Sequence, residues 1–252
     1  MTQKIIAVVN QKGGVGKTTT TINVAAQLAT AGHSVLLADL DPQGNATSGL
    51  GLDKHGPVTM YELLCQGQQL PNAILETNVA QLFVIAANTN LAGAEIELVD
   101  RPQREYTLQK ILQLADYDYI VIDCPPSLGL LTINALTAAT QVLMPVQAEY
   151  YALEGLSQLL NTVQAVKHST NPQLELLGVV LTMYDKRTTL SEQVRDEVKK
   201  YFGENLFKTV IPRNIRLAEA PSYGKTIFEH DKWSKGARAY KALTKEIISR
   251  TQ

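Results

Sequence analysis

The sequence predicts an α/β fold, a single doubly wound and mainly parallel sheet with helices on both faces. Two observations lead to this prediction. Short apolar runs rich in β-branched residues alternate with segments of helix-forming composition along the chain. No Gly/Ser-rich or Pro-rich linker and no internal repeat divides the 252 residues, of which 45% are hydrophobic, so one domain spanning residues 1–252 is expected.

The apolar runs are typical of strands buried on both faces of a sheet. They lie at residues 4–9, 34–39, 82–87, 119–123, 141–146 and 176–182. Helices are predicted between and after them, at residues 17–31, 105–115, 130–139, 153–167, 190–202 and 236–250. Such sheets bind ligands beyond the carboxyl ends of their strands, so the loops at that edge are expected to carry the function.

Composition narrows the function classes. Cys65 and Cys124 form neither a CxxC pair nor a spaced ligand set, which favours a reducing cytoplasm over a disulfide framework or a zinc site. The N-terminus lacks the pattern of a secretory signal, and no apolar run approaches the roughly 20 residues that a membrane helix needs. The expectation is a cytoplasmic protein that does not bind membrane.

The charge is unevenly distributed. Residues 1–185 carry 8 Lys/Arg against 16 Asp/Glu, whereas residues 186–252 carry 15 against 8, within a net charge of -1. The net charge argues against a constitutive nucleic-acid binder. The basic C-terminal part is either a set of solvated helix residues or, if folding gathers it on one face, a surface that attracts a polyanion.

The segment "NQKGGVGKTTT", residues 10–20, follows the first predicted strand. Gly13, Gly14 and Gly16 allow the backbone to turn so that successive N–H groups surround an anion. Lys17 adds a positive charge, and the Thr18 hydroxyl occupies the position of a Mg²⁺ ligand in phosphate loops. Strand, glycine loop, "GKT" and helix therefore predict a nucleotide-phosphate site.

One departure from the general G-x-x-x-x-G-K-[ST] pattern concerns the entrance of the loop, where Gln11 stands in place of the first glycine and Lys12 follows it. "KGGVGKT" resembles the deviant Walker A loop of the P-loop NTPase family that includes ParA partition ATPases, MinD, nitrogenase iron protein and the arsenite-pump ATPase. The resemblance implies that Lys12 crosses a dimer interface to the partner's nucleotide, whose phosphates offset the several kcal/mol of burying a lysine. The alternative is an exposed lysine on a loop.

The same resemblance assigns the nucleotide contacts and the catalytic residues. The implied ATP/ADP contacts in the loop are Lys12, Gly13, Gly14, Val15, Gly16, Lys17, Thr18 and Thr19. Lys12, Lys17 and Asp41 are the implied catalytic residues.

Carboxylates follow two of the predicted strands. In "ADLDPQGN" Asp39 and Asp41 are two residues apart, so an extended backbone directs both toward one side. By resemblance to the family's first switch, Asp41 positions the attacking water and Asp39 supports the Mg²⁺ shell. Asp123 ends the strand "YIVID" like a Walker B aspartate and is expected to hold Mg²⁺ through water, since a buried carboxylate without a partner is unfavourable.

The chain resembles the chromosomal ParA (Soj) family over essentially its whole length. The stretches that carry this resemblance include "LADLDPQGNATSGLG", "VLMPVQAEYYALEGLSQLL" and "VIPRNIRLAEAPSYGKTI". The family places residues 149–155 near its dimer contact and Pro212, Arg213 and Asn214 near the adenine, with Arg213 ambiguous between adenine and DNA. Like the short family members, the chain shows no N-terminal helix-turn-helix, so sequence-specific operator binding is not expected.

The resemblance also implies partners. ParA proteins are homodimers in the ATP state, bind double-stranded DNA nonspecifically on the nucleoid, and are stimulated by a ParB partner through its basic N-terminal peptide. The candidate phosphate contact is Arg216, with Arg187, Lys200, Lys225 and Lys235 as further candidates. The alternative interpretation is that each of these five basic residues is a solvated surface residue.

Two alternatives stay open on the same fold. A MinD-like membrane-associated ATPase ends in an amphipathic helix, and the tail "ARAYKALTKEIISRTQ" aligns Tyr240, Leu243, Ile247 and Ile248 on one side. This apolar side is narrow and lacks Phe or Trp, which favours a terminal helix packed on the core. An enzyme of small-molecule metabolism or electron transfer would need a substrate pocket or paired cysteine ligands, for which no separate motif is found.

Overall fold

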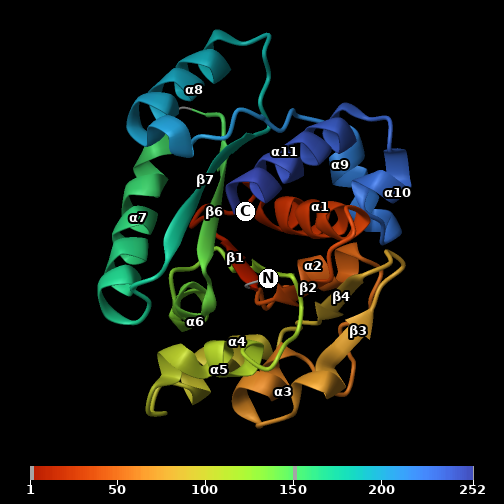
Figure 1. Cartoon of the computed structure of the whole chain (residues 1–252), viewed down its shortest axis with the longest axis vertical. Helices are drawn as coiled ribbons and strands as arrows, with labels where there is room; N and C mark the ends of the chain where they lie inside the picture. Colours follow the sequence, from red (N-terminus) through yellow and green to blue (C-terminus); the bar gives the residue numbers. More distant parts are fainter. Residues whose placement is uncertain (1–2, 150–151, 252) are drawn as a thin grey trace.

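The computed structural model describes residues 3–149 and 152–251. Within these residues one seven-stranded sheet runs in the order β3-β4-β2-β5-β1-β6-β7 (Figure 1). The strands are β1 (Lys4–Val8), β2 (Val35–Asp39), β3 (Ile74–Glu76), β4 (Leu82–Ile85), β5 (Tyr119–Asp123), β6 (Gln141–Gln147) and β7 (Glu175–Thr182). All neighbours pair in parallel except β3 and β4, which confirms the predicted mainly parallel sheet.

The predicted helices are present, with ends shifted by a few residues. The helices are α1 (Lys17–Thr30), α2 (Asn45–Gly49), α3 (Met60–Cys65), α4 (Leu91–Glu97), α5 (Thr107–Leu112), α6 (Leu130–Ala138), α7 (Ala152–Ser169), α8 (Thr189–Phe202), α9 (Ile215–Glu219), α10 (Ile227–Asp231) and α11 (Lys235–Thr251). The sequence missed β3 and α2, α3, α4, α9 and α10, all of seven residues or fewer. Segments this short have no extended periodicity to detect.

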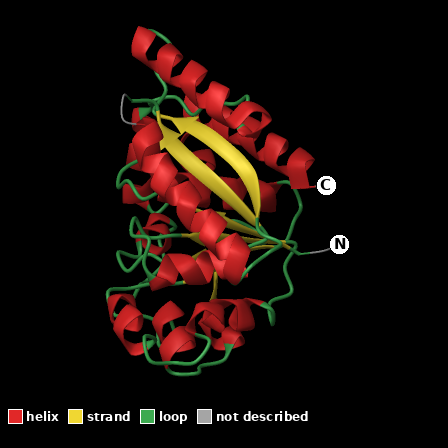
Figure 2. Ribbon diagram, turned by 90° about the vertical axis from the view of Figure 1, so that its left-hand side faces the viewer, coloured by secondary structure: helices red, strands yellow, loops and turns green. Residues whose placement is uncertain are grey.

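Two hydrophobic layers enclose the sheet, and Figure 2 shows helices on both sides of the strands. Alternate residues of β1 belong to different layers: Ile5 and Ala7 pack into one, Ile6 and Val8 into the other. The first layer includes side chains of α3 to α8, and the second includes α1 and α11. Burial on both faces explains why the central strands are continuous apolar runs in the sequence.

The central strands bring the predicted site together. β1 and β2 both pair with β5, with Val8 and Asp39 each in register with Asp123. The glycine loop after β1 and the carboxylates that end β2 and β5 therefore share the carboxyl edge of the sheet, as expected for this class of fold.

The last helix, α11, packs against α1. Tyr240, Leu243 and Ile247 are buried in the second layer, and Ile248 is partly buried against it. The apolar side that could have served a membrane is thus used in the core. Among the described residues, no helix is long and apolar enough to cross a membrane.

Candidate functional site

The loop between β1 and α1 has the backbone of an anion cradle. Gly14 and Gly16 adopt left-handed conformations, with φ of 75° and 89°. A Cβ on Gly13 or Gly14 would meet no heavy atom within 4 Å, so the space beside the loop is open. Because Gly16 supplies no side-chain cap to α1, the first N–H groups of this helix are available to a ligand.

Hydrogen bonds from neighbouring strands hold the loop in this shape. The Thr182 hydroxyl at the end of β7 donates to the Val15 carbonyl at 2.7 Å. The Asn10 side chain donates to the Pro145 carbonyl at 2.7 Å and accepts from the Lys12 amide at 3.0 Å. The shape of the cradle is therefore held by contacts within the chain, which reduces the entropy lost on binding.

Lys17 lies inside the loop and is only 7% exposed. Its Nζ donates to the Lys12 carbonyl at 3.0 Å. Burial lowers the pKa of Lys17, and the nearby Asp123 opposes this effect. A buried ammonium group with a single hydrogen bond is poorly compensated, so phosphate oxygens are the partners that this position suits.

Asp123 is fully buried at the end of β5. Its Oδ1 accepts a hydrogen bond from the Thr21 hydroxyl at 2.9 Å, whereas its Oδ2 has no partner among the described residues. Burial raises the pKa of Asp123, and the charge of Asp39 raises it further. An unpaired buried carboxylate oxygen fits a cation or the water bound to one.

The site does not form a metal cage of side chains. No group of three or more His, Cys, Asp or Glu in the described part of the chain could hold a metal ion. Mg²⁺ in phosphate sites commonly needs only one or two protein ligands, because substrate phosphates and water complete its shell. Thr18, which lines the cavity beside the loop, and Asp123 fit that arrangement.

Asp41 and Asp39 have different surroundings. Asp41 lines the cavity, and its Oδ1 accepts from the Gln43 amide at 2.9 Å. Asp39 is fully buried. Its Oδ2 accepts hydrogen bonds from the Thr47 amide at 2.9 Å and from the Thr47 hydroxyl at 2.8 Å. Its Oδ1 accepts a hydrogen bond from the Asp41 amide at 3.2 Å. Asp39 thus holds the loop that presents Asp41. Its support of the Mg²⁺ shell stays a prediction.

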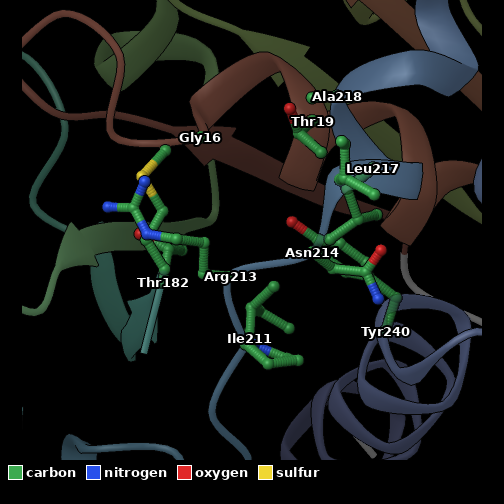
Figure 3. A pocket seen from close by; sticks show the side chains of 12 residues that line it. Gly16, Thr19, Thr182, Ile211, Arg213, Asn214, Leu217, Ala218 and Tyr240 are labelled. Carbon is green, nitrogen blue, oxygen red and sulfur yellow. The ribbon is translucent and has the colours of Figure 1, made fainter. Parts of the chain in front are cut away.

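Two cavities meet beside the loop. The first, of about 360 Å³, is lined by Gly13, Gly14, Gly16, Lys17, Thr18, Thr19, Asp41, Gln43, Asn45, Pro126 and Met183. The second, of about 380 Å³, is lined mainly by apolar groups of β7, α9, α11 and the segment at residues 211–214 (Figure 3). Both are lined by Gly16, Thr19 and Met183. A polar compartment joined to an apolar one suits a ligand with a phosphate end and a flat base.

The second cavity contains the residues that the resemblance placed near adenine, Pro212, Arg213 and Asn214. It also contains residues that the sequence analysis did not assign to a site, including Met183 and Tyr240. The sequence indicates Tyr240 only as part of the apolar side of the last helix. Its hydroxyl is hydrogen-bonded to that of Thr20 at 3.0 Å, a contact across 220 positions that no local pattern reveals.

Lys12 lies beside the cavity rather than in it. Its side chain is 50% exposed and forms an ion pair with Glu149 of the same chain. Residues 150 and 151 of the predicted dimer contact, 149–155, lie outside the described residues. The exposed ammonium group can exchange its partner, because ion pairs at the surface are weak.

The basic candidates form two groups. Arg216, Lys225 and Lys235 are exposed on or next to α9, α10 and α11. Arg187 and Lys200 belong to the α8 region, which lies apart from α9 and α10 (Figure 1). Arg187 and Lys200 as DNA contacts therefore stay a prediction, on a part of the surface separate from Arg216.

Two of these cations, Arg216 and Arg187, have acidic partners. Arg216 Nη1 is 2.9 Å from Glu219 Oε2, and its Nε is 3.7 Å from Asp231 Oδ2. Arg187 is paired with Asp185 at 2.8 Å. These pairs reduce the positive field that a polyanion meets at Arg216 and Arg187.

The parallel sheet, the glycine loop followed by a helix, and the carboxylates at the ends of adjacent strands are together the features of a P-loop NTPase. Residues 3–176 match the model of a family described as an AAA domain. The chain belongs to the Soj/ParA family of chromosome-partitioning ATPases.

Relatives of nearly equal length carry this assignment. The chain is 58% identical over 249 residues to the sporulation initiation inhibitor protein Soj of Bacillus subtilis, covering 98% of both proteins. It is 51% identical over 250 residues to the chromosome partitioning protein ParA of Myxococcus xanthus, covering 98% of this chain and 88% of the relative.

A solved structure with a different name is also similar. Cobyrinic acid a,c-diamide synthase from Mycobacterium smegmatis, determined with bound ADP and magnesium, has a TM-score of 0.87 and 40% sequence identity. The alignment covers 99% of this chain and 96% of that one.

Proposed function

We propose that this protein is a DNA-partition ATPase that dimerises around ATP, binds DNA nonspecifically as the dimer, and hydrolyses ATP when a ParB-type partner stimulates it. The observation that carries the proposal is that Lys17, Thr18 and Asp41 line one cavity, while the loop's second lysine, Lys12, stays half exposed beside it. A lysine in that position can reach a second molecule.

Nucleotide binding follows from the two joined cavities. The loop amides and Lys17 bind the phosphates, and the cavity that contains Pro212 and Asn214 takes the adenine. Thr18 would hold Mg²⁺ directly and Asp123 would hold it through water, which would use the carboxylate oxygen that has no partner among the described residues. The chemistry supplied by a bound Mg²⁺ would be a positive charge that offsets the negative charge of the phosphates.

Hydrolysis requires mainly positioning and charge stabilisation, because phosphoryl transfer needs little covalent chemistry from the protein. Asp41, held by Gln43 and by the loop that Asp39 anchors, orients the attacking water. Lys12 of the other protomer stabilises the developing negative charge. Each protomer then completes its partner's site, so turnover depends on the dimer.

DNA binding is assigned to the group of Arg216, Lys225 and Lys235. One weak nonspecific site has a Kd of roughly 10⁻⁴ to 10⁻⁶ M at physiological salt. Two sites joined in a dimer gain a factor on the order of 10² to 10⁴ through effective concentration. Dimerisation alone is therefore sufficient to switch the protein onto the nucleoid.

The test is ATPase activity with and without duplex DNA and a lysine- and arginine-rich peptide of the kind found at a ParB N-terminus. We expect slow hydrolysis with ATP alone and the highest rate with DNA and peptide together. A rate that neither addition changes would contradict the proposal.

A second candidate rests on the 40% identity with the structure named as a diamide synthase. A synthetase turns over only with its second substrate, so sustained phosphate release from ATP, DNA and peptide alone distinguishes the partition ATPase from such an enzyme. The competing MinD-like function gains no support from α11, since Tyr240, Leu243 and Ile247 are buried.

A further inference from the structure

Met183 has an unusual backbone. Its φ of 51° is left-handed, and it shares a positive φ with only two other non-glycine residues in the described part of the chain, Gln81 and Gln103. Those two are exposed, whereas Met183 is partly buried directly after β7. A residue with a Cβ rarely adopts this conformation unless its surroundings impose it.

Hydrogen bonds of the residues before and after Met183 impose its left-handed conformation. The preceding Thr182 is held by its hydroxyl to the Val15 carbonyl at 2.7 Å and by its carbonyl to the Ala148 amide at 3.1 Å. The following Tyr184 donates its amide to the Ile211 carbonyl at 3.0 Å and accepts from the Arg213 amide at 3.2 Å. The chain must change direction within one residue, between the phosphate loop and the segment proposed to hold the base.

Met183 also occupies a junction. It lines both the polar cavity of Lys17 and Asp41 and the apolar cavity of Pro212 and Asn214. The other two residues common to both cavities, Gly16 and Thr19, belong to the loop and α1. Met183 therefore supplies the wall of the junction opposite the P-loop segment.

We propose that Met183 is a positioning residue for the nucleoside, and that its left-handed backbone persists because it directs the thioether side chain against the bond between base and sugar. This inference rests on the proposed nucleotide function. Methionine suits the position because its side chain is flexible and its sulfur makes favourable contacts with aromatic rings. Glycine would adopt the backbone more easily but would leave the junction open.

The test compares Met183→Gly with the volume-conserving Met183→Leu. Binding of ATP and of inorganic tripolyphosphate, which has no nucleoside, is measured by calorimetry for wild type and both variants. We expect Met183→Gly to weaken ATP binding about tenfold, because an apolar contact is lost, and to leave tripolyphosphate binding unchanged. Met183→Leu should stay within about twofold of wild type for both ligands.

Thermal melting without ligand supplies a second readout. Met183→Gly should melt at or above the wild-type temperature, since glycine relieves the left-handed strain. Unchanged ATP affinity in Met183→Gly would overturn the inference, as would equal weakening of ATP and tripolyphosphate, which indicates a distorted phosphate loop. If the wild type binds tripolyphosphate but not ATP, the proposed function itself fails.

Discussion

Single residues at the carboxyl edge of the sheet combine burial with unsatisfied polarity. Asp123 is fully buried with one oxygen unpaired among the described residues, and Lys17 is buried with one hydrogen bond. Groups in such surroundings are unfavourable for the folded chain without a ligand. In the proposed nucleotide site an anion beside Lys17 and a cation beside Asp123 would recover this unfavourable energy, so the same residues would lower stability and create affinity.

The first prediction concerns pH. Burial raises the pKa of Asp123 to about 8, whereas a carboxyl in the unfolded chain titrates near 4. Between these values the folded state binds more protons than the unfolded state, so the free energy of unfolding falls as pH rises. In metal-free protein with chelator, Asp123→Asn should flatten this slope between pH 5 and 8, measured by urea unfolding. The control is Asp53→Asn at an exposed position. Equal slopes of unfolding free energy against pH for wild type, Asp123→Asn and Asp53→Asn would contradict the prediction.

The second prediction concerns Asp41. Asp41→Ala should still bind ATP and dimerise, because the loop amides and Lys17 are untouched. Its hydrolysis rate should fall about 10²-fold or more, since the attacking water loses its orienting group. Phosphate release and DNA retention measured on the same sample should show a dimer trapped on DNA. Turnover at the wild-type rate would remove Asp41 from the mechanism.

The third prediction concerns Arg216, the exposed cation shared by Glu219 and Asp231. Arg216→Ala should dimerise with ATP but bind DNA more weakly, and the slope of log affinity against log salt should decrease by about 1 per chain. Gel shifts at several salt concentrations measure both. Lys110→Ala on α5 is the matched control. Glu219→Gln removes the charge paired with Arg216 and should therefore strengthen DNA binding. Unchanged DNA affinity in Arg216→Ala would exclude Arg216 as a DNA contact.

Among the helices, α11 connects distant parts of the chain. Its Tyr240 lines the apolar cavity and bonds to Thr20 of α1, and its Arg250 donates to the Leu177 carbonyl at 2.9 Å. A helix with these contacts cannot leave the core without exposing Leu243 and Ile247. Its amphipathic pattern therefore reflects packing.

The fourth prediction follows from this packing. With ATP and liposomes of anionic lipid, the protein should stay in the supernatant, because insertion of α11 would require unpacking three buried side chains, Tyr240, Leu243 and Ile247. Sedimentation with and without ATP measures it. Deleting α11 would open the core, so a truncated chain is not a useful control. The control is Lys241→Glu, a substitution on the exposed side of α11. ATP-dependent sedimentation that Lys241→Glu abolishes would favour the MinD-like function.

For the molecule as a whole, the glycine loop carries a second lysine, Lys12, that does not line the cavity of its own chain. Lys12 is paired with Glu149 at the surface, and Lys17 lines the cavity beside the glycine loop. A dimer that places Lys12 on the other nucleotide exchanges a weak exposed pair for a charge-assisted contact with phosphate. ATP would thus stabilise the dimer directly.

The fifth prediction tests this exchange. Lys12→Ala should bind ATP with near-wild-type affinity but stay monomeric, whereas Lys17→Ala should lose ATP binding. Light scattering in saturating ATP and magnesium, with the Asp41→Ala background to block turnover, separates monomer from dimer. Normal dimerisation of the Lys12→Ala, Asp41→Ala double variant would show that the trans role is wrong.

Local sequence was sufficient to predict the central strands, the long helices, the glycine loop and the carboxylates at the ends of β2 and β5. These features depend on periodicity within one segment and on residues adjacent to strand ends, and parallel pairing then brings the strand ends to one edge. No comparable local signal predicts the short helices or the antiparallel strand β3. The same is true of the separation of Arg187 and Lys200 from Arg216.

In the apolar half of the pocket, the family resemblance indicated Pro212, Arg213 and Asn214, whereas Met183 and Tyr240 became known only from the folded chain. Tyr240 reaches Thr20 across 220 positions, and the left-handed Met183 results from hydrogen bonds that Thr182 and Tyr184 make to other segments. Contacts of this kind depend on how distant elements pack, and packing is a property of the whole core rather than of any short stretch. Most of the polar cavity beside the glycine loop comes from segments that the sequence identifies locally, whereas the apolar cavity is assembled from segments far apart in the chain.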